Sequence, residues 1–132
     1  MTSPRWKFEI KTGRLFDPYT GKVLWQGYAG GNCGKDPIGK NNPDYIKVKS
    51  VGPLCPGVYT FGTPVAQSHL GPFAIPLTPD PSNEMYGRSD FYCHGDTTPS
   101  GNASEGCIIL PRWVRDQMWA SKIHTLEVVI SL

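Results

Sequence analysis

A histidine and a cysteine in the C-terminal half of the chain carry the chemistry that this sequence shows most clearly. His94 closes an apolar segment that begins at Phe91, and Cys107 follows Gly106 at the start of a second apolar run. A thiol becomes a strong nucleophile only as the thiolate, so it needs a base or a positive field beside it. If the two apolar segments are neighbouring strands, the imidazole can take the proton of the thiol. The pattern therefore indicates a Cys107–His94 dyad for acyl transfer.

The residues just before Cys107 favour a functional turn over a core strand. Gly106 permits a tight turn and lets the N–H groups of Gly106 and Cys107 approach a substrate oxygen, as an oxyanion hole requires. Ser104 is expected to shape this turn rather than to react. On spacing alone, a buried core cysteine and a structural loop histidine remain the alternative.

The composition is typical of one globular domain, which we assign to residues 1–132. Hydrophobic residues make up 39% of the chain and charged residues 18%, and 13 basic against 11 acidic residues leave a net charge of +2. No basic run with interleaved aromatics indicates nucleic-acid binding, and no apolar stretch is long enough for a membrane span. The N-terminus lacks an apolar signal-peptide core, so we expect a protein made in the cytoplasm without a signal peptide.

The four cysteines contain no C-x-x-C pair, so the sequence predicts neither a zinc ribbon nor a thioredoxin motif, and it suggests no metal and no cofactor. Cys33 and Cys55 lie in loops rich in Gly and Pro. A Cys33–Cys55 disulfide is one interpretation, and two independent small residues are the other. Cys93 alternates to the strand face opposite His94, so we expect it to pack in the core.

The elements that must position these groups are mainly strands. The 15 Gly and 13 Pro residues are spread along the chain, which favours short elements joined by turns. Pro76 confines its strand to an edge or an end of the sheet, and the last strand is apolar enough to be central. Strands are expected at residues 6–10, 14–16, 22–26, 45–51, 58–61, 73–77, 91–94 and 125–130, with long loops at 29–44 and 78–90.

One helix is expected at residues 111–120. Pro111 is a favourable first helical residue, and Leu110, Val114 and Met118 recur at the four-residue spacing of a buried helix face.

The order of the motifs resembles a known family. His94-Gly95, followed by Ser104-Glu105-Gly106-Cys107, resembles the signature of the L,D-transpeptidase catalytic-domain family, which reads His-Gly, a variable loop and Ser-His-Gly-Cys. The wider pattern is similar to one branch of it, the type VI secretion effectors with an L,D-transpeptidase-like fold. The features of this branch that we identify lie between residues 28 and 130, in the segments 39–44, 51–57, 77–85, 87–89 and 94–96.

This resemblance implies a fold and a reaction. The fold would be an L,D-transpeptidase-like β-sandwich or barrel of mixed sheets with the one short helix. Cys107 would attack the bond between diaminopimelate and D-Ala in a peptidoglycan tetrapeptide stem, with His94 as base and the Gly95 carbonyl orienting the imidazole. Water as acceptor would give an L,D-carboxypeptidase, and a free D-amino acid would give exchange. The resemblance also implies a type VI secretion component, action in the target-cell periplasm and a cognate immunity protein.

One position departs from the family signature, and several residues have more than one interpretation. Glu105 replaces the signature's second histidine and would raise the thiol pKa unless it points to solvent, as we expect. Arg88 could pair with a substrate carboxylate or form a surface ion pair. Asp96 could bond His94 or substrate, but a turn-stabilising role is favoured. His69 and His124 lie outside the signature and are expected to be structural or solvent-facing.

Two other functions stay open at this point. A papain-like cell-wall amidase or endopeptidase would also use Cys and His, although there the Cys precedes the His along the chain, typically at a helix start. A non-catalytic wall-binding module stabilised by disulfides would instead require Cys107 to be oxidised.

Overall fold

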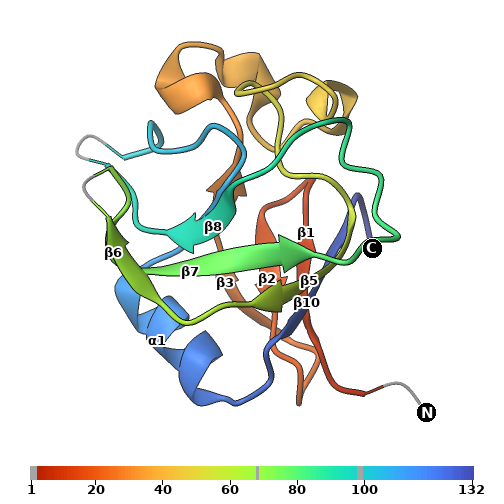
Figure 1. Ribbon diagram of the computed structural model, residues 1–132, viewed down its shortest axis with the longest axis vertical. Coiled ribbons are helices and arrows are strands. Elements are labelled where there is room, and N and C mark those ends of the chain that lie inside the picture. The colour runs from red at the N-terminus through yellow and green to blue at the C-terminus, as the bar shows by residue number, and fades with distance from the viewer. Residues whose placement is uncertain (1–2, 68, 98–99) are drawn as a thin grey trace.

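The structure is a computed structural model that describes residues 3–67, 69–97 and 100–132 (Figure 1). Within these residues ten strands form one mixed sheet, in the order β3-β2-β1-β10-β5-β7-β8-β9-β4, with β6 paired to β7 outside that path. The mainly β class and the single short helix are confirmed for this part of the chain. The strands are β1 (Trp6–Glu9), β2 (Arg14–Phe16), β3 (Val23–Gln26), β4 (Tyr28–Ala29), β5 (Gly57–Phe61), β6 (Val65–Gln67), β7 (Gly71–Pro79), β8 (Phe91–His94), β9 (Ile108–Ile109) and β10 (Thr125–Val129).

The sheet curls until it is nearly a closed barrel. Its two end strands, β3 and β4, are consecutive in the chain and are separated only by Gly27. A Cβ at Gly27 would collide with the carbonyl oxygen of Ile109, so the absence of a side chain allows this close approach. Because β3 and β4 are adjacent in the chain, the curl brings the β9–β4 end of the sheet next to its β3 end.

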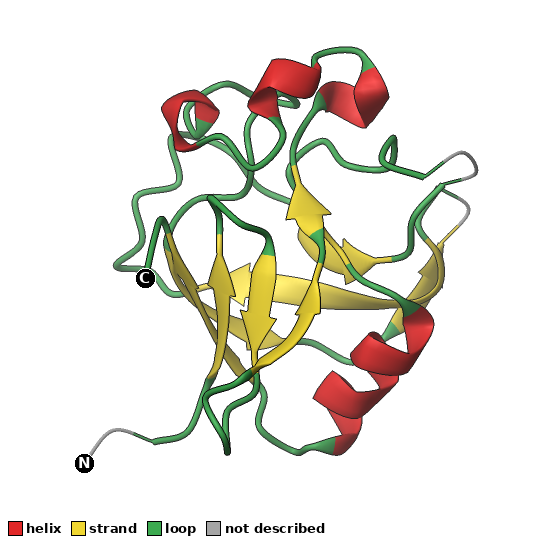
Figure 2. Cartoon of the chain, turned by 180° about the vertical axis from the view of Figure 1, so that it is seen from behind, coloured by secondary structure: helices red, strands yellow, loops and turns green. Residues whose placement is uncertain are grey.

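The core follows from the alternation of side chains along the strands. Strand β10 is central, parallel to β1 and antiparallel to β5, as its apolar sequence predicts. Leu126 and Val128 point inward from it and are almost fully buried, as are Trp6 and Phe8 of β1. Burying such side chains contributes roughly 1.5–3 kcal/mol each to the folded state. Helix α1 (Arg112–Ala120) closes the lower side of the barrel (Figure 2).

Pro76 does not confine its strand to an edge, contrary to the expectation. Strand β7 pairs with β8 on one side, and on the other side it pairs first with β6 and then with β5. The β6 pairing ends at Ala74 and the β5 pairing begins at Leu77, so Pro76 lies in the gap between them. The Pro76 carbonyl accepts from the Gly62 N–H, and Gly62 lies between β5 and β6. The Pro76 nitrogen, which carries no hydrogen, points to the same side, where neither strand needs a hydrogen bond from it.

Residues 45–51 do not form the expected strand. Three short 3-10 helices occupy this region, η1 (Asn32–Gly34), η2 (Pro37–Gly39) and η3 (Pro43–Tyr45). Tyr45 ends η3, and residues 46–51 continue as turns. The Asn42 side chain accepts from Asp44 N–H at the start of η3, and Val48 N–H returns to the Tyr45 carbonyl. These local bonds replace a strand ladder. The three helices lie together at one end of the barrel, and we call residues 30–56 the crown loop (Figure 2).

The helix prediction holds to within one residue. Pro111 precedes the first helical residue as its N-cap, and Val114 and Met118 are fully buried, as the spacing predicts. Among the described residues no helix has the length and hydropathy needed to cross a membrane.

Candidate active site

The parallel pairing of β8 with β9 brings His94 and Cys107 to one face of the sheet. Cys93 is opposite Ile108 and His94 is opposite Ile109. Side chains alternate along a strand, so Cys107, two residues before Ile109, lies on the same side as His94. Cys93 and Ile108 point the other way and are fully buried in the core.

The two side chains line the same cavity, which has a volume of about 690 Å³. A second cavity of about 460 Å³ shares His94 with the first, so the histidine lies between two recesses. His94 is only 4% exposed, whereas Cys107 is half-buried. The first recess is lined by Cys33, Lys49, Ser50, Gln67, His69, Leu70, Gly87, Arg88, Ser89, Asp90, Phe91, Tyr92, His94, Ala103, Glu105 and Cys107.

The Cys107 thiol is held between two backbone groups. The Tyr92 N–H donates to its sulfur at 3.3 Å, and the sulfur lies 3.9 Å from the Asp90 carbonyl, to which it can donate. Burial raises the pKa of Cys107 to about 11; the Tyr92 N–H lowers it, Glu105 raises it and Arg88 lowers it. The resting group is therefore a neutral thiol that needs a base before it can react.

His94 is oriented by the residue that follows it. Its Nδ1 lies 2.9 Å from the Gly95 carbonyl, which can only accept, so Nδ1 carries the proton and Nε2 keeps the lone pair. Burial lowers the pKa of His94; the Gly95 carbonyl opposes this, and the nearby Arg115 cation adds to it. The imidazole is therefore neutral near pH 7 and able to accept a proton.

Ser104 shapes the turn before Cys107, as expected. The side chain is fully buried, and its hydroxyl donates to the Cys107 carbonyl at 2.6 Å. The same oxygen accepts from Gly30 N–H at 2.7 Å and from Gly106 N–H at 3.0 Å. This last bond corrects one expectation, because the Gly106 N–H is already engaged and is not a free oxyanion donor. The Tyr92 N–H and the Cys107 N–H both face the Cys107 sulfur and lower the thiol pKa, so these two are the backbone donors beside that sulfur.

Arg88 forms no ion pair with any residue that the structure describes, contrary to one of its two expected roles. It is 7% exposed, and its two terminal nitrogens donate to four backbone carbonyls. Nη1 reaches Ile46 at 2.6 Å and Pro53 at 2.7 Å. Nη2 reaches Gly52 at 3.0 Å and Glu105 at 3.2 Å. The guanidinium thus ties the crown loop to the Cys107 turn, and these donors are not directed at a substrate carboxylate.

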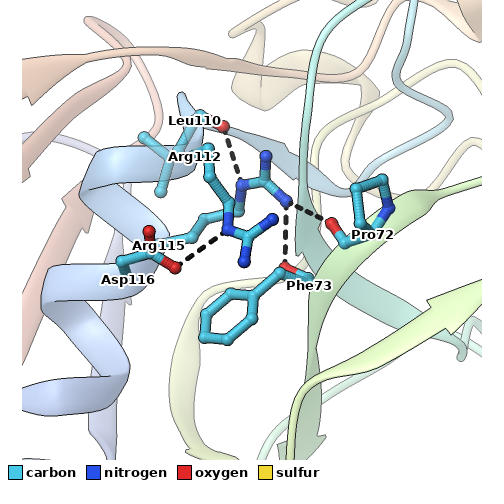
Figure 3. A network of polar contacts seen from close by, with 6 residues as sticks. All are labelled: Pro72, Phe73, Leu110, Arg112, Arg115 and Asp116. Carbon is cyan, nitrogen blue, oxygen red and sulfur yellow. Dashed lines mark hydrogen bonds and ion pairs between the residues drawn. The ribbon is translucent and has the colours of Figure 1, made fainter.

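A second buried arginine, Arg115, lies near enough to His94 for its charge to lower the pKa of that histidine. Figure 3 shows the carbonyl groups that Arg115 binds. Its Nε donates to Leu110 at 3.0 Å, and Nη1 donates to Pro72 and Phe73 at 2.9 Å each. A Cβ on Gly95 would lie 3.0 Å from this guanidinium, so the cation packs closely against the residue that orients the histidine. Arg115 thus joins α1 to the start of β7 and to the end of β9.

The two acidic candidates near the site have different surroundings. Asp96 stabilises its turn by accepting from Thr97 and Gly101 N–H groups, and it also accepts from the Tyr28 hydroxyl at 2.6 Å. Those bonds lower the Asp96 pKa against the opposing effect of burial. Glu105 is exposed, in line with its expected outward orientation, although its charge still raises the pKa of Cys107.

Two residues that the sequence did not single out for the site line its cavities. Lys49, from the crown loop, lines the larger recess, and His69, from the turn between β6 and β7, lines both. Neither stands in a local motif, so only their positions in the fold bring them to the site. His124, by contrast, stacks on Trp119 with ring centroids 4.1 Å apart, and is structural as expected.

The cysteines do not form the Cys33–Cys55 disulfide. All four are free thiols; Cys33 is exposed beside the site, whereas Cys55 is fully buried. Among the described residues no group of three or more His, Cys, Asp or Glu side chains could hold a metal ion.

Comparison with known proteins gives one match. The model of the family described as the Tlde1 domain matches residues 28–131. Neither the curated proteins nor the solved structures give a match to this chain.

Proposed function

The chain belongs to the Tlde1 domain family, type VI secretion effectors that act on peptidoglycan, and from that premise we propose that it is a cysteine L,D-carboxypeptidase or L,D-transpeptidase. Its substrate would be the tetrapeptide stem, cleaved between diaminopimelate and D-Ala. The observation that carries the proposal is that one cavity is lined by both Cys107, as a neutral thiol, and His94, as a neutral imidazole oriented by the Gly95 carbonyl.

The first half-reaction needs one proton transfer and one bond exchange. The sulfur turns from the Asp90 carbonyl toward His94, whose Nε2 takes its proton. The thiolate then attacks the carbonyl carbon of the diaminopimelate L-centre, and the Cys107 N–H faces the oxyanion. When the tetrahedral intermediate collapses, the C–N bond breaks and His94 returns the proton to the amine of D-Ala. A thioester on Cys107 remains.

The second half-reaction decides which activity results. His94 deprotonates either water or the amine of a D-amino acid, which attacks the thioester and releases Cys107. Water shortens the stem, and the amino acid replaces D-Ala. Either product deprives the target cell of stems for cross-linking, which is consistent with the antibacterial role and the immunity partner that the family implies.

Lys49 is the residue that we expect to meet a carboxylate of the stem. The Arg88 guanidinium donates to backbone carbonyls, whereas Lys49 lines the larger recess from its crown-loop side. A flexible ammonium group at the edge of a cavity suits a carboxylate that moves in with a substrate.

The alternatives lose support from particular features of the chain. In a papain-like hydrolase the Cys starts a helix before the His, whereas Cys107 follows His94 and precedes strand β9. A disulfide-stabilised binding module would need an oxidised Cys107, but this residue is a free thiol.

The direct test is incubation of the protein with purified tetrapeptide muropeptides, followed by mass spectrometry. We expect loss of D-Ala, or its replacement when another D-amino acid is added. Cleavage within the stem or at the glycan junction would contradict the proposal. A complementary test directs the protein to the periplasm or retains it in the cytoplasm. We expect growth arrest only in the periplasm, and killing from the cytoplasm would exclude a wall substrate.

A further inference from the structure

The Arg88 guanidinium is a buried cation that pairs with no carboxylate of the described part of the chain. Ion pairs among the described residues join Arg5 and Lys7 to Glu127 and Arg112 to Asp116, and none includes Arg88. We propose that Arg88 is the positioning residue of the nucleophile, holding the Cys107 turn through its backbone and supplying the positive charge that stabilises the Cys107 thiolate. This deepens the proposed function, since it rests on Cys107 as the nucleophile.

The geometry provides the positioning part of this role. The four carbonyls that Arg88 binds come from two separate segments, three from the crown loop and one from Glu105. Its guanidinium also lies against Gly106, where a Cβ would be only 2.7 Å from Nη2. The cation therefore contacts both residues that precede Cys107. Gly106 leaves room for it because it has no side chain, and its φ of 133° is a backbone conformation that favours glycine.

The charge provides the electrostatic part. Carbonyl dipoles satisfy the donors of a guanidinium but leave its net charge in place, and a charge removed from water acts more strongly on its neighbours. The Arg88 charge lowers the pKa of Cys107. Cys55 also lies near Arg88, but it is fully buried and cannot contact a substrate. Cys107 lines the cavity, so it is the thiol whose reactivity toward a substrate the Arg88 charge can change.

This cation opposes the unfavourable effect of Glu105. The Glu105 carboxylate raises the pKa of Cys107, and it stands where the resembled signature has a histidine. Arg88 supplies a positive charge from beneath the turn, while Glu105 is exposed above it. Among the described residues, the other charged or titratable side chains that line the cavity are His94, Asp90, Lys49, Tyr92, Cys33 and His69, and Cys93 is close enough to Cys107 to interact with it.

The test is the pH dependence of Cys107 alkylation by iodoacetamide, followed on the Cys107 peptide by mass spectrometry in a Cys33→Ala background. This reaction reports the thiolate and needs no peptidoglycan. In Arg88→Met we expect the inflection to move up by about one pH unit, so that alkylation at pH 8 slows about tenfold. Arg88→Lys keeps the charge and should move it much less. Glu105→Gln, at an exposed position, should move it down.

If Arg88→Met does not fold, Arg88→citrulline decides, because it keeps the shape and most donors of the side chain but carries no charge. It should shift the inflection as Arg88→Met would. An inflection equal to wild type in a folded, neutral Arg88 variant would overturn the proposal. Because the readout is chemical modification, a wild-type protein that left muropeptides intact would refute the proposed substrate and leave this result unaffected.

Discussion

The two halves of the candidate site are held in place in different ways. His94 ends a regular strand, and its main chain continues the ladder to β9, since the Leu110 N–H donates to the His94 carbonyl at 3.0 Å. Cys107 lies on an irregular turn held by the Ser104 hydroxyl and the Arg88 guanidinium. The proposed base is thus positioned by a sheet, and the proposed nucleophile by side chains that bond to backbone groups of loops.

Each half also has a buried arginine, but the two cations have opposite consequences. Arg88 lowers the pKa of Cys107 and so favours its charged form. Arg115 lowers the pKa of His94 and so favours its neutral form. The first effect makes the thiol lose its proton more readily. The second keeps the imidazole unprotonated and so available as a base, although it also makes the imidazole a weaker proton acceptor. The same residue type therefore serves an acid and a base, because the cation stabilises a thiolate but destabilises an imidazolium.

Removing either proposed reacting group should lower activity to the same extent, although the two halves of the site are held in different ways. Cys107→Ala and His94→Ala are each expected to lower D-Ala release on the order of 10⁴-fold, because neither half can act without the other. Muropeptide mass spectrometry measures this, and Cys33→Ala, which removes an exposed thiol beside the site, is the matched control. Wild-type activity in the Cys107 or His94 variant would eliminate the dyad.

Ser104→Ala should disturb the nucleophile's half alone. The change leaves the Gly30 and Gly106 N–H groups and the Cys107 carbonyl without their shared partner. We expect a loss of about 3 kcal/mol in the free energy of unfolding in urea, together with slower Cys107 alkylation.

Ser89→Ala is the control for this change, because Ser89 is an exposed serine that lines the same recess as Cys107. It should alter the free energy of unfolding by less than about 0.5 kcal/mol. Equal effects of the two substitutions would mean that the Ser104 bonds do not hold the turn.

Arg115→Met should disturb the base's half. Protonated His94 cannot accept the thiol proton, so activity is lost as pH falls through the pKa of His94, which lies below the ordinary value of 6.5. Removing the cation raises this pKa, so the acid limb of kcat/KM should move to higher pH.

Arg112→Met tests whether any cation of α1 has this effect. Arg112 is exposed and pairs with Asp116 at 2.9 Å, whereas Arg115 is buried and binds the carbonyls of Leu110, Pro72 and Phe73 (Figure 3). Its acid limb should stay near that of wild type. A shift to lower pH in Arg115→Met would contradict the electrostatic role assigned to Arg115.

The smallest effect is expected where the two halves meet the substrate. Lys49→Met should raise KM for tetrapeptide stems roughly threefold with little change in kcat, as the loss of one exposed charge contact would. Lys47→Met is the control, since Lys47 lies over the Tyr86 ring at 5.1 Å from its centroid and does not line the recess. A change in kcat alone would show that Lys49 does not act in binding.

The regular part of this protein could be predicted from sequence because its signals are local. Alternating residues indicate β1 and β10, and Val114 and Met118 mark the buried face of α1. The types and spacing of neighbouring residues also singled out His94 and Cys107. The same kind of pattern gave a wrong prediction at residues 45–51, where apolar and lysine residues alternate as in a strand. There the backbone groups form hydrogen bonds within single turns instead.

Only the tertiary structure decided how the Cys107 turn and its surroundings are built. Arg88 binds carbonyls 17 to 42 residues away in the chain, and no sequence pattern marks a carbonyl, because every residue has one. Lys49 and His69 also line the cavity, although both are distant from His94 and Cys107 in the chain. The sequence by itself thus singled out the proposed nucleophile, its proposed base and the apolar segments that carry them. The charges that tune them depend on which distant backbone segments the fold brings together.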